Sequence, residues 1–144
     1  MSDLYDEDIV LWSERQGKLL RRRAAGELVN EAELDWPNIA EEIESVGNEQ
    51  RFAVESLLVQ AIVHRLKAQA WRDCRDMESW LADSMRFRGD AASRFVPSMR
   101  QRIDLDRIYR RALRAMPRAI DGQPAPPPEP ACPFTLDWLL SEEP

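Results

Sequence analysis

The chain has 144 residues, of which 44% are hydrophobic and 32% charged, and this suits one soluble domain. Its longest uncharged apolar run, residues 57–63, is far shorter than the roughly 20 residues that cross a bilayer. Cys74 and Cys132 are too few for a disulfide framework, so we expect reduced thiols. Because the first residues are acidic, where an export leader would be basic, we expect a cytoplasmic protein without a membrane partner.

The net charge of −6 is unevenly distributed along the chain. Residues 1–64 hold 14 acidic and 6 basic side chains, residues 65–118 hold 7 and 14, and residues 119–144 hold 5 and none. This division indicates that an acidic first half pairs with a basic second half, in the same chain or in a second copy. We favour pairing within the chain and keep a homodimer as an alternative.

The N-terminal segment has the periodicity of an amphipathic helix. We expect this helix to begin at Ser2 or Asp3 and to end before Gly26, after three arginines that suit a helix C-terminus. Residues 26–35 then form a polar connection. The apolar stripe consists of Tyr5, Ile9, Trp12, Gln16 and Leu19.

A second helix is predicted from Pro37 to about Ala70. It begins after Asp35, a capping residue, with a proline in the first turn, where the missing N–H has no cost. Gly47 lies in its middle and costs about 1 kcal/mol relative to alanine, so one kinked helix and two collinear helices both remain open. The face that we expect to pack consists of Ile39, Ile43, Val46, Gln50, Val54, Leu57, Ala61 and Ile62.

Two more helices are predicted after an ambiguous charged segment, residues 71–77. The third helix spans about 78–95, and Pro97 marks a corner before a fourth helix from Met99 to about Ala115. No strand pattern is present. The sequence therefore predicts an all-α fold, an antiparallel bundle of four main helices in residues 1–118.

The C-terminal residues 119–144 are predicted to form a strap and a short helix. Six prolines within residues 123–133 exclude helix and favour an extended segment. Thr135 can cap one or two helical turns, and the cluster Trp138-Leu139-Leu140 is expected to dock on the bundle.

Several motifs together are typical of one bacterial family. With them the chain, up to about residue 115, resembles the domain of unknown function numbered 29. The resemblance implies an α-helical fold of this size and brings no activity, substrate or cofactor. The motifs are Tyr5-Asp6-Glu7-Asp8 before Leu11-Trp12, the block from Asp35 to Gly47 with its Glu-Glu-Ile-Glu-Ser-Val-Gly, His64-Arg65-Leu66-Lys67, and Ser79-Trp80.

Two carboxylate pairs form a candidate metal site. Glu41 and Glu44 share one helical face, and Asp73 and Asp76 repeat their spacing. Mg²⁺ prefers such oxygen ligands, and the pattern loosely resembles the metal-binding pairs of all-α nucleotide pyrophosphohydrolases. The ordinary interpretation, a solvated or arginine-paired acidic face, is favoured, and no cofactor is expected except Mg²⁺ under this alternative.

His64 is the only histidine. It follows the apolar run of the second helix, slightly outside the stripe, so we expect a boundary residue bound to a neighbouring carboxylate or carbonyl. A general base or a metal ligand is the alternative interpretation.

The predicted fourth helix carries a basic face made of Arg100, Arg107, Arg110, Arg111 and Arg114. Such a face could bind nucleic acid, but the isoelectric point of about 4.9 disfavours this. We therefore expect a protein-interaction or regulatory module rather than an enzyme. A Mg²⁺-dependent hydrolase of a phosphorylated small molecule is the first alternative, and nucleic-acid binding is the second.

Overall fold

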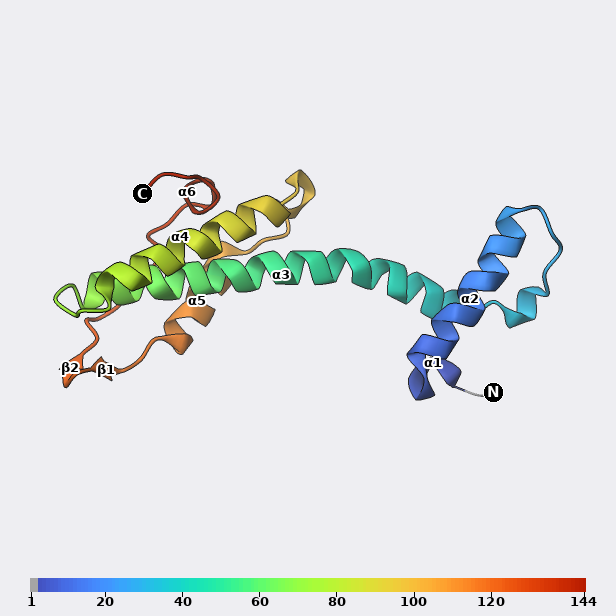
Figure 1. The fold of residues 1–144 in the computed structure, drawn as a ribbon, viewed down its shortest axis with the longest axis horizontal. Coiled ribbons are helices and arrows are strands. Elements are labelled where there is room, and N and C mark those ends of the chain that lie inside the picture. Colours follow the sequence, from blue (N-terminus) through green and yellow to red (C-terminus); the bar gives the residue numbers. More distant parts are fainter. Residues whose placement is uncertain (1–2) are drawn as a thin grey trace. The chain divides into compact units, whose positions relative to one another are not determined.

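The computed structural model describes residues 3–144, so Ser2, one of the predicted helix starts, lies outside the described residues. The predicted all-α bundle is confirmed. The described residues form α1 (Leu4–Glu7), α2 (Ile9–Ala24), α3 (Trp36–Ala70), α4 (Met77–Arg94), α5 (Leu105–Ala115) and α6 (Leu136–Leu139), with short 3-10 turns at Glu31–Glu33 and Pro97–Met99 (Figure 1).

The N-terminal segment is divided into two helices, so the prediction of one continuous helix was wrong. Asp8 ends α1 and begins α2, with φ −152° and ψ 86°. Its side chain accepts a hydrogen bond from the backbone N–H of Leu11 at 3.0 Å. An aspartate that caps a helix in this way stabilises the break, which the apolar periodicity does not reveal.

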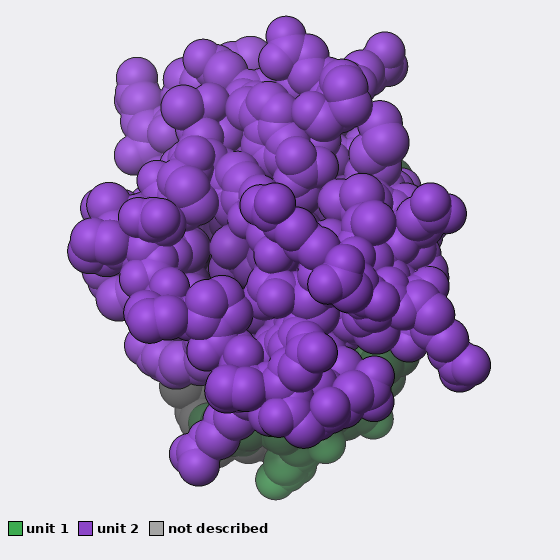
Figure 2. Space-filling model, turned by 90° about the vertical axis from the view of Figure 1, so that its left-hand side faces the viewer, with its two compact units in different colours: residues 1–48 green, residues 49–144 purple. Residues whose placement is uncertain are grey.

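Helix α3 begins and ends close to the predicted residues and is continuous through Gly47 (Figure 1). The question of a break at this glycine is thereby answered in favour of one helix. The chain divides into two compact units, residues 1–48 (unit 1) and residues 49–144 (unit 2), which are coloured in Figure 2. Helix α3 contributes residues to both units.

The described part of unit 1 consists of α1, α2 and the first part of α3, with a small core. Its buried hydrophobic residues are Trp12, Leu34 and Ile39. Polar side chains join α2 to the start of α3: the Trp12 indole N–H donates to the Asp35 carboxylate at 2.9 Å. The Gln16 amide donates to the carbonyl of Glu33 at 3.0 Å and accepts from the backbone N–H of Asp35 at 2.9 Å.

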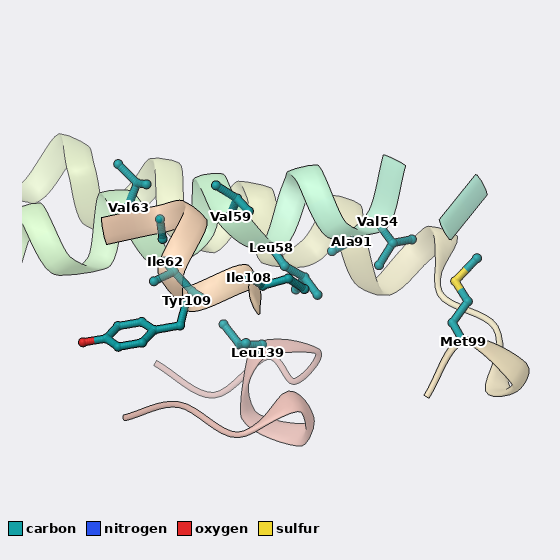
Figure 3. Packing of buried hydrophobic residues seen from close by; sticks show 11 residues of the cluster. Val54, Leu58, Val59, Ile62, Val63, Ala91, Met99, Ile108, Tyr109 and Leu139 are labelled. Carbon is teal, nitrogen blue, oxygen red and sulfur yellow. The ribbon is translucent and has the colours of Figure 1, made fainter. Parts of the chain in front are cut away.

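Unit 2 has a larger core between α3, α4, α5 and the C-terminal segment. Figure 3 shows Leu58 and Ile62 of α3 packed with Ile108 and Tyr109 of α5, and Leu139 of α6 joins the same cluster. Helix α4 lies alongside the second half of α3, where the hydroxyl of Ser84 donates to the carbonyl of Ala61 at 2.7 Å. These contacts bury one face of each helix.

Helix α5 is shorter than predicted, and the expected start at Met99 was wrong. Met99 ends the 3-10 turn that begins at Pro97, and a turn separates it from Leu105. Asp104 caps α5, since its side chain accepts from the backbone N–H of Arg107 at 3.2 Å. The cap therefore sets the start of the helix.

The tail contains a short hairpin, so the expectation of no strands was also wrong. Strands β1 (Ala119–Ile120) and β2 (Gln123–Pro124) pair antiparallel around Asp121 and Gly122, whose φ values are 51° and 77°. Two positive φ values are typical of a tight hairpin turn, in which Asp-Gly is favoured.

Hydrogen bonds join the tail to the other elements of unit 2. The Trp71 indole donates to the carbonyl of Gln123 at 3.0 Å, and the Tyr109 hydroxyl to that of Glu129 at 2.8 Å. Thr135 caps α6, as predicted, by accepting from the backbone N–H of Trp138. Both cysteines are free, and no helix among residues 3–144 is long and apolar enough to cross a membrane.

Candidate interaction surfaces

Exposed apolar side chains are concentrated in unit 1. Of the nine large hydrophobic residues that are exposed among residues 3–144, six belong to this unit, which holds one third of the chain. Single exposed apolar residues are ordinary, whereas neighbouring ones that form a contiguous patch are typical of an interaction surface. The six are Ile9, Val10, Leu28, Trp36, Ile43 and Val46.

The predicted apolar face of α3 is uncovered in its middle. Ile39 is 7% exposed and Val54 fully buried, whereas Ile43 is 69% and Val46 62% exposed. Gln50, next along the same face, is also exposed. The expectation that this face is packed along its whole length was therefore wrong, and we call Ile43 and Val46, both in unit 1, the open stripe.

The surroundings of the open stripe are acidic. By sequence, unit 1 holds 12 acidic and 5 basic side chains. Glu41 and Glu44, two of the predicted metal ligands, are exposed on α3. Glu42 accepts a hydrogen bond from the Tyr5 hydroxyl at 2.5 Å, and this bond raises the pKa of Tyr5 to about 12. An apolar stripe bordered by carboxylates suits a partner that is both apolar and basic.

Helix α5 presents the predicted basic face. Ile108, Tyr109 and Ala112 bury one side of the helix, and four arginines lie exposed on its other sides. Within residues 3–144 none of the four forms an ion pair. The predicted pairing inside the chain is therefore not observed for them. We call Arg107, Arg110, Arg111 and Arg114 the α5 arginines.

Arg100 differs from the other members of the predicted basic face. It lies outside α5, in the turn after Pro97–Met99, and its guanidinium pairs with the Asp137 carboxylate at 2.8 Å. Both side chains are more than half exposed, so this pair contributes little to stability. The placement of Arg100 on the fourth helix was wrong because that helix begins later than predicted.

The four predicted metal ligands are divided between the two units. Glu41 and Glu44 belong to unit 1, whereas Asp73 lies in the turn after α3 and Asp76 directly before α4, both in unit 2. Among the described residues no three His, Cys, Asp or Glu side chains form a group that could hold a metal ion. The magnesium site stays a prediction from the sequence pattern.

His64 lies at the edge of the unit 2 core. Its Nδ1 is 2.8 Å from the carbonyl oxygen of Gln60, and its Nε2 is 4.0 Å from the Asp83 carboxylate. The ring packs against Phe87 with centroids 5.2 Å apart. An Nδ1 proton donated to Gln60 leaves Nε2 as an acceptor in the neutral ring. This is the environment of a boundary histidine bound to a carbonyl.

The sequence matches one family model, described as "Domain of unknown function DUF29", over residues 4–143. The chain belongs to the DUF29 family. No curated protein and no solved structure is significantly similar to it. The DUF29 match continues beyond residue 115, the expected limit of the resemblance, and includes the strap and α6.

Arg88 is a structural residue of this DUF29 chain that sequence reasoning missed. It is only 2% exposed and donates to the carbonyls of Trp138 at 2.8 Å and Ser141 at 3.0 Å. Its guanidinium carbon lies 3.7 Å from the centre of the Trp138 ring, and desolvation lowers its pKa. Arg88 follows Trp80 and Ser84 at intervals of four residues, and this shared buried face was the available signal.

Proposed function

We propose that this protein is a protein-interaction module and that its binding surface is centred on the open stripe of α3. The observation that carries the proposal is the exposure of Ile43 and Val46 in the middle of a face that is buried at both ends. A partner that covers the stripe would continue the buried face without interruption.

The free energy of burial favours such a partner. Removing apolar surface from water contributes about 25 cal/mol per Å², and a valine or isoleucine side chain gains roughly 1.5–3 kcal/mol on full burial. Interfaces commonly derive most of their affinity from a few central side chains. Ile43 and Val46 are suited to this role because they are adjacent on one helical face.

The small core of unit 1 supports the same conclusion. Segments of about 40 residues rarely bury enough apolar surface to be stable without additional contacts. Unit 1 buries three large hydrophobic residues and exposes six. A partner that binds the folded state of this unit would stabilise it by mass action.

The two alternatives have less support. Nucleic-acid binding would use the α5 arginines, and its affinity would fall steeply with salt concentration. The acidic chain as a whole, however, repels phosphate. A Mg²⁺-dependent hydrolase would need the two carboxylate pairs to converge, and no specific observation favours this.

Photo-crosslinking in the native host tests the proposal. A photoreactive amino acid replaces Val46, and in a matched variant it replaces Met85, which is 49% exposed on α4 of unit 2. We expect ultraviolet light to produce a discrete protein adduct at position 46 and none at position 85. If position 46 gives no more adduct than position 85, the open stripe is not an interface and the proposal fails.

A further inference from the structure

We infer that the partner of the open stripe is a basic amphipathic helix of another protein. Its apolar side chains cover Ile43 and Val46, and its lysine or arginine side chains pair with the carboxylates beside them. This inference rests on the proposed function, because it identifies the partner of the same surface. All of the residues that carry it belong to unit 1.

The exposed apolar side chains of α3 form a row with the length of a short helix. Trp36, which is 44% exposed, lies two turns before Ile43 on the same side of α3, and the exposed Ala40 lies between them. At a rise of about 1.5 Å per residue, the row is roughly 15 Å long. We call Trp36, Ala40, Ile43 and Val46 the apolar row.

A helix fits the apolar row better than a strand does. The described part of unit 1 contains no strand, so it offers no sheet edge with which an extended partner could pair. An exposed helix face instead receives the ridges of a second helix in the grooves between its own side chains, and the short side chain of Ala40 leaves such a groove. The partner needs apolar residues at intervals of three and four, which is also the spacing of the row.

The polar group of the apolar row already has a hydrogen-bond partner. The Trp36 indole N–H donates to the Glu31 carboxylate at 3.2 Å. Glu31 also forms an ion pair with Arg23, whose guanidinium carbon lies 5.8 Å from the centre of the Trp36 ring. A buried donor without a partner would cost about 1–3 kcal/mol. A helix that covers Trp36 therefore avoids this cost.

Two carboxylates beside the apolar row have no ion-pair partner. Glu41 and Glu44 are exposed on α3 and form no ion pair within residues 3–144. Residues 24–48 hold seven acidic side chains and no lysine or arginine, since the five basic residues of unit 1 all lie within residues 15–23. A partner with cations beside its apolar face complements this charge, whereas an acidic partner is repelled.

Model peptides test the inference on the purified full chain. The probe is a leucine–lysine peptide of about 14 residues, or about four helical turns, with leucine at helical spacing. One control peptide has glutamate in place of lysine, and another has the same composition in an order that forms no apolar face. In calorimetric titrations we expect the probe to bind about tenfold or more tightly than either control. Equal binding of a control, or no binding of the probe, would overturn the inference.

Two apolar substitutions test whether the probe binds at the open stripe. Val46→Ser should raise the Kd of the probe about tenfold, because a few central side chains supply most of the affinity of an interface. Met85→Ser, at an exposed position of α4 in unit 2, should leave the Kd unchanged. Equal effects of the two substitutions would show that the probe binds elsewhere and would contradict the inference.

Two double substitutions test the role of charge. Glu41→Gln with Glu44→Gln should weaken binding of the probe and make the Kd less sensitive to salt, because salt screens exposed charge pairs. Glu78→Gln with Asp90→Asn removes two exposed carboxylates of α4 and so changes the net charge equally. It should have the smaller effect. If both pairs weaken binding equally, the attraction comes from the net charge of the chain, and the assigned basic partner is wrong.

Photo-crosslinking at position 46 separates this inference from the proposed function. Mass spectrometry of the adduct identifies the partner segment, which we expect to have apolar residues at helical spacing and an excess of lysine and arginine. An acidic segment, one without helical spacing, or an adduct of twice the 16.7 kDa mass of the chain would overturn the basic helix and leave the interaction module standing. If position 46 gives no more adduct than position 85, both conclusions fail.

Discussion

The two units share one helix but differ in how they are stabilised. In unit 2, α3 contributes to a main cluster of 11 buried residues that also includes α4, α5 and α6 (Figure 3). In unit 1 the cluster has three buried hydrophobic residues, and polar side chains such as Gln16 and Asp35 join α2 to α3.

This difference implies different local stabilities. Regions with few buried apolar contacts open with smaller free energies than the core of the same protein. We therefore expect unit 2 to be the more stable part of the chain and unit 1 to open first. A low-stability element whose burial is incomplete is the kind of element that a partner can order.

The largest expected difference in the free energy of unfolding is between substitutions at two residues of the same helix, α3. Ile62→Ala in the unit 2 core creates a cavity and should lower the free energy of unfolding by about 2–5 kcal/mol. Ile43→Ala should change it by less than about 0.5 kcal/mol in the monomer, because the side chain is exposed. Urea unfolding of dilute protein measures both. Equal losses would mean that Ile43 is buried within one chain.

The anchor of the tail should produce the next largest effect. Arg88→Leu removes the donor shared by the carbonyls of Trp138 and Ser141, and each buried unsatisfied group costs about 1–3 kcal/mol. We expect lower overall stability and faster amide hydrogen exchange in α6. Arg86→Leu, on the exposed side of α4, is the control. If α6 stays protected in Arg88→Leu, the buried arginine does not hold the tail.

A smaller effect should be confined to unit 1. Gln16→Ala removes both amide contacts to the segment before α3, and each hydrogen bond contributes about 0.5–1.5 kcal/mol. Hydrogen exchange should become faster in α2 and the start of α3, while unit 2 keeps its protection. Gln50→Ala, at an exposed position of α3, should leave exchange in both units unchanged. Loss of protection throughout the chain would show that the units unfold together.

The bounds of α3 were predictable because local signals determine them. Asp35 and Pro37 mark the start, and the helical period persists to the end. The break at Asp8 and the late start of α5 depend on Asp caps that compete with a continuing apolar period. Periodicity identifies the apolar face of a helix, but it does not show whether another element covers it, so the exposure of Ile43 could not be predicted.

The smallest expected effect is a pH dependence of stability that is confined to unit 1. The hydrogen bonds that Asp35 accepts from Asn38, and less strongly from Trp12, lower its pKa below the ordinary 3.8. Since the folded pKa lies below the unfolded value, Asp35 contributes stability that is present above the unfolded pKa and is lost as pH falls through the folded pKa.

Acidification from neutral pH should therefore accelerate hydrogen exchange around Trp12 before it accelerates exchange in the unit 2 core. Both rates are compared with the intrinsic exchange rate at the same pH. Asp35→Asn keeps an acceptor but cannot titrate, so its unit 1 protection should be lower near neutral pH and depend less on pH. An unchanged acid response in Asp35→Asn would assign the dependence to other carboxylates of this acidic unit. Asp35 would then join α2 to α3 through its geometry alone.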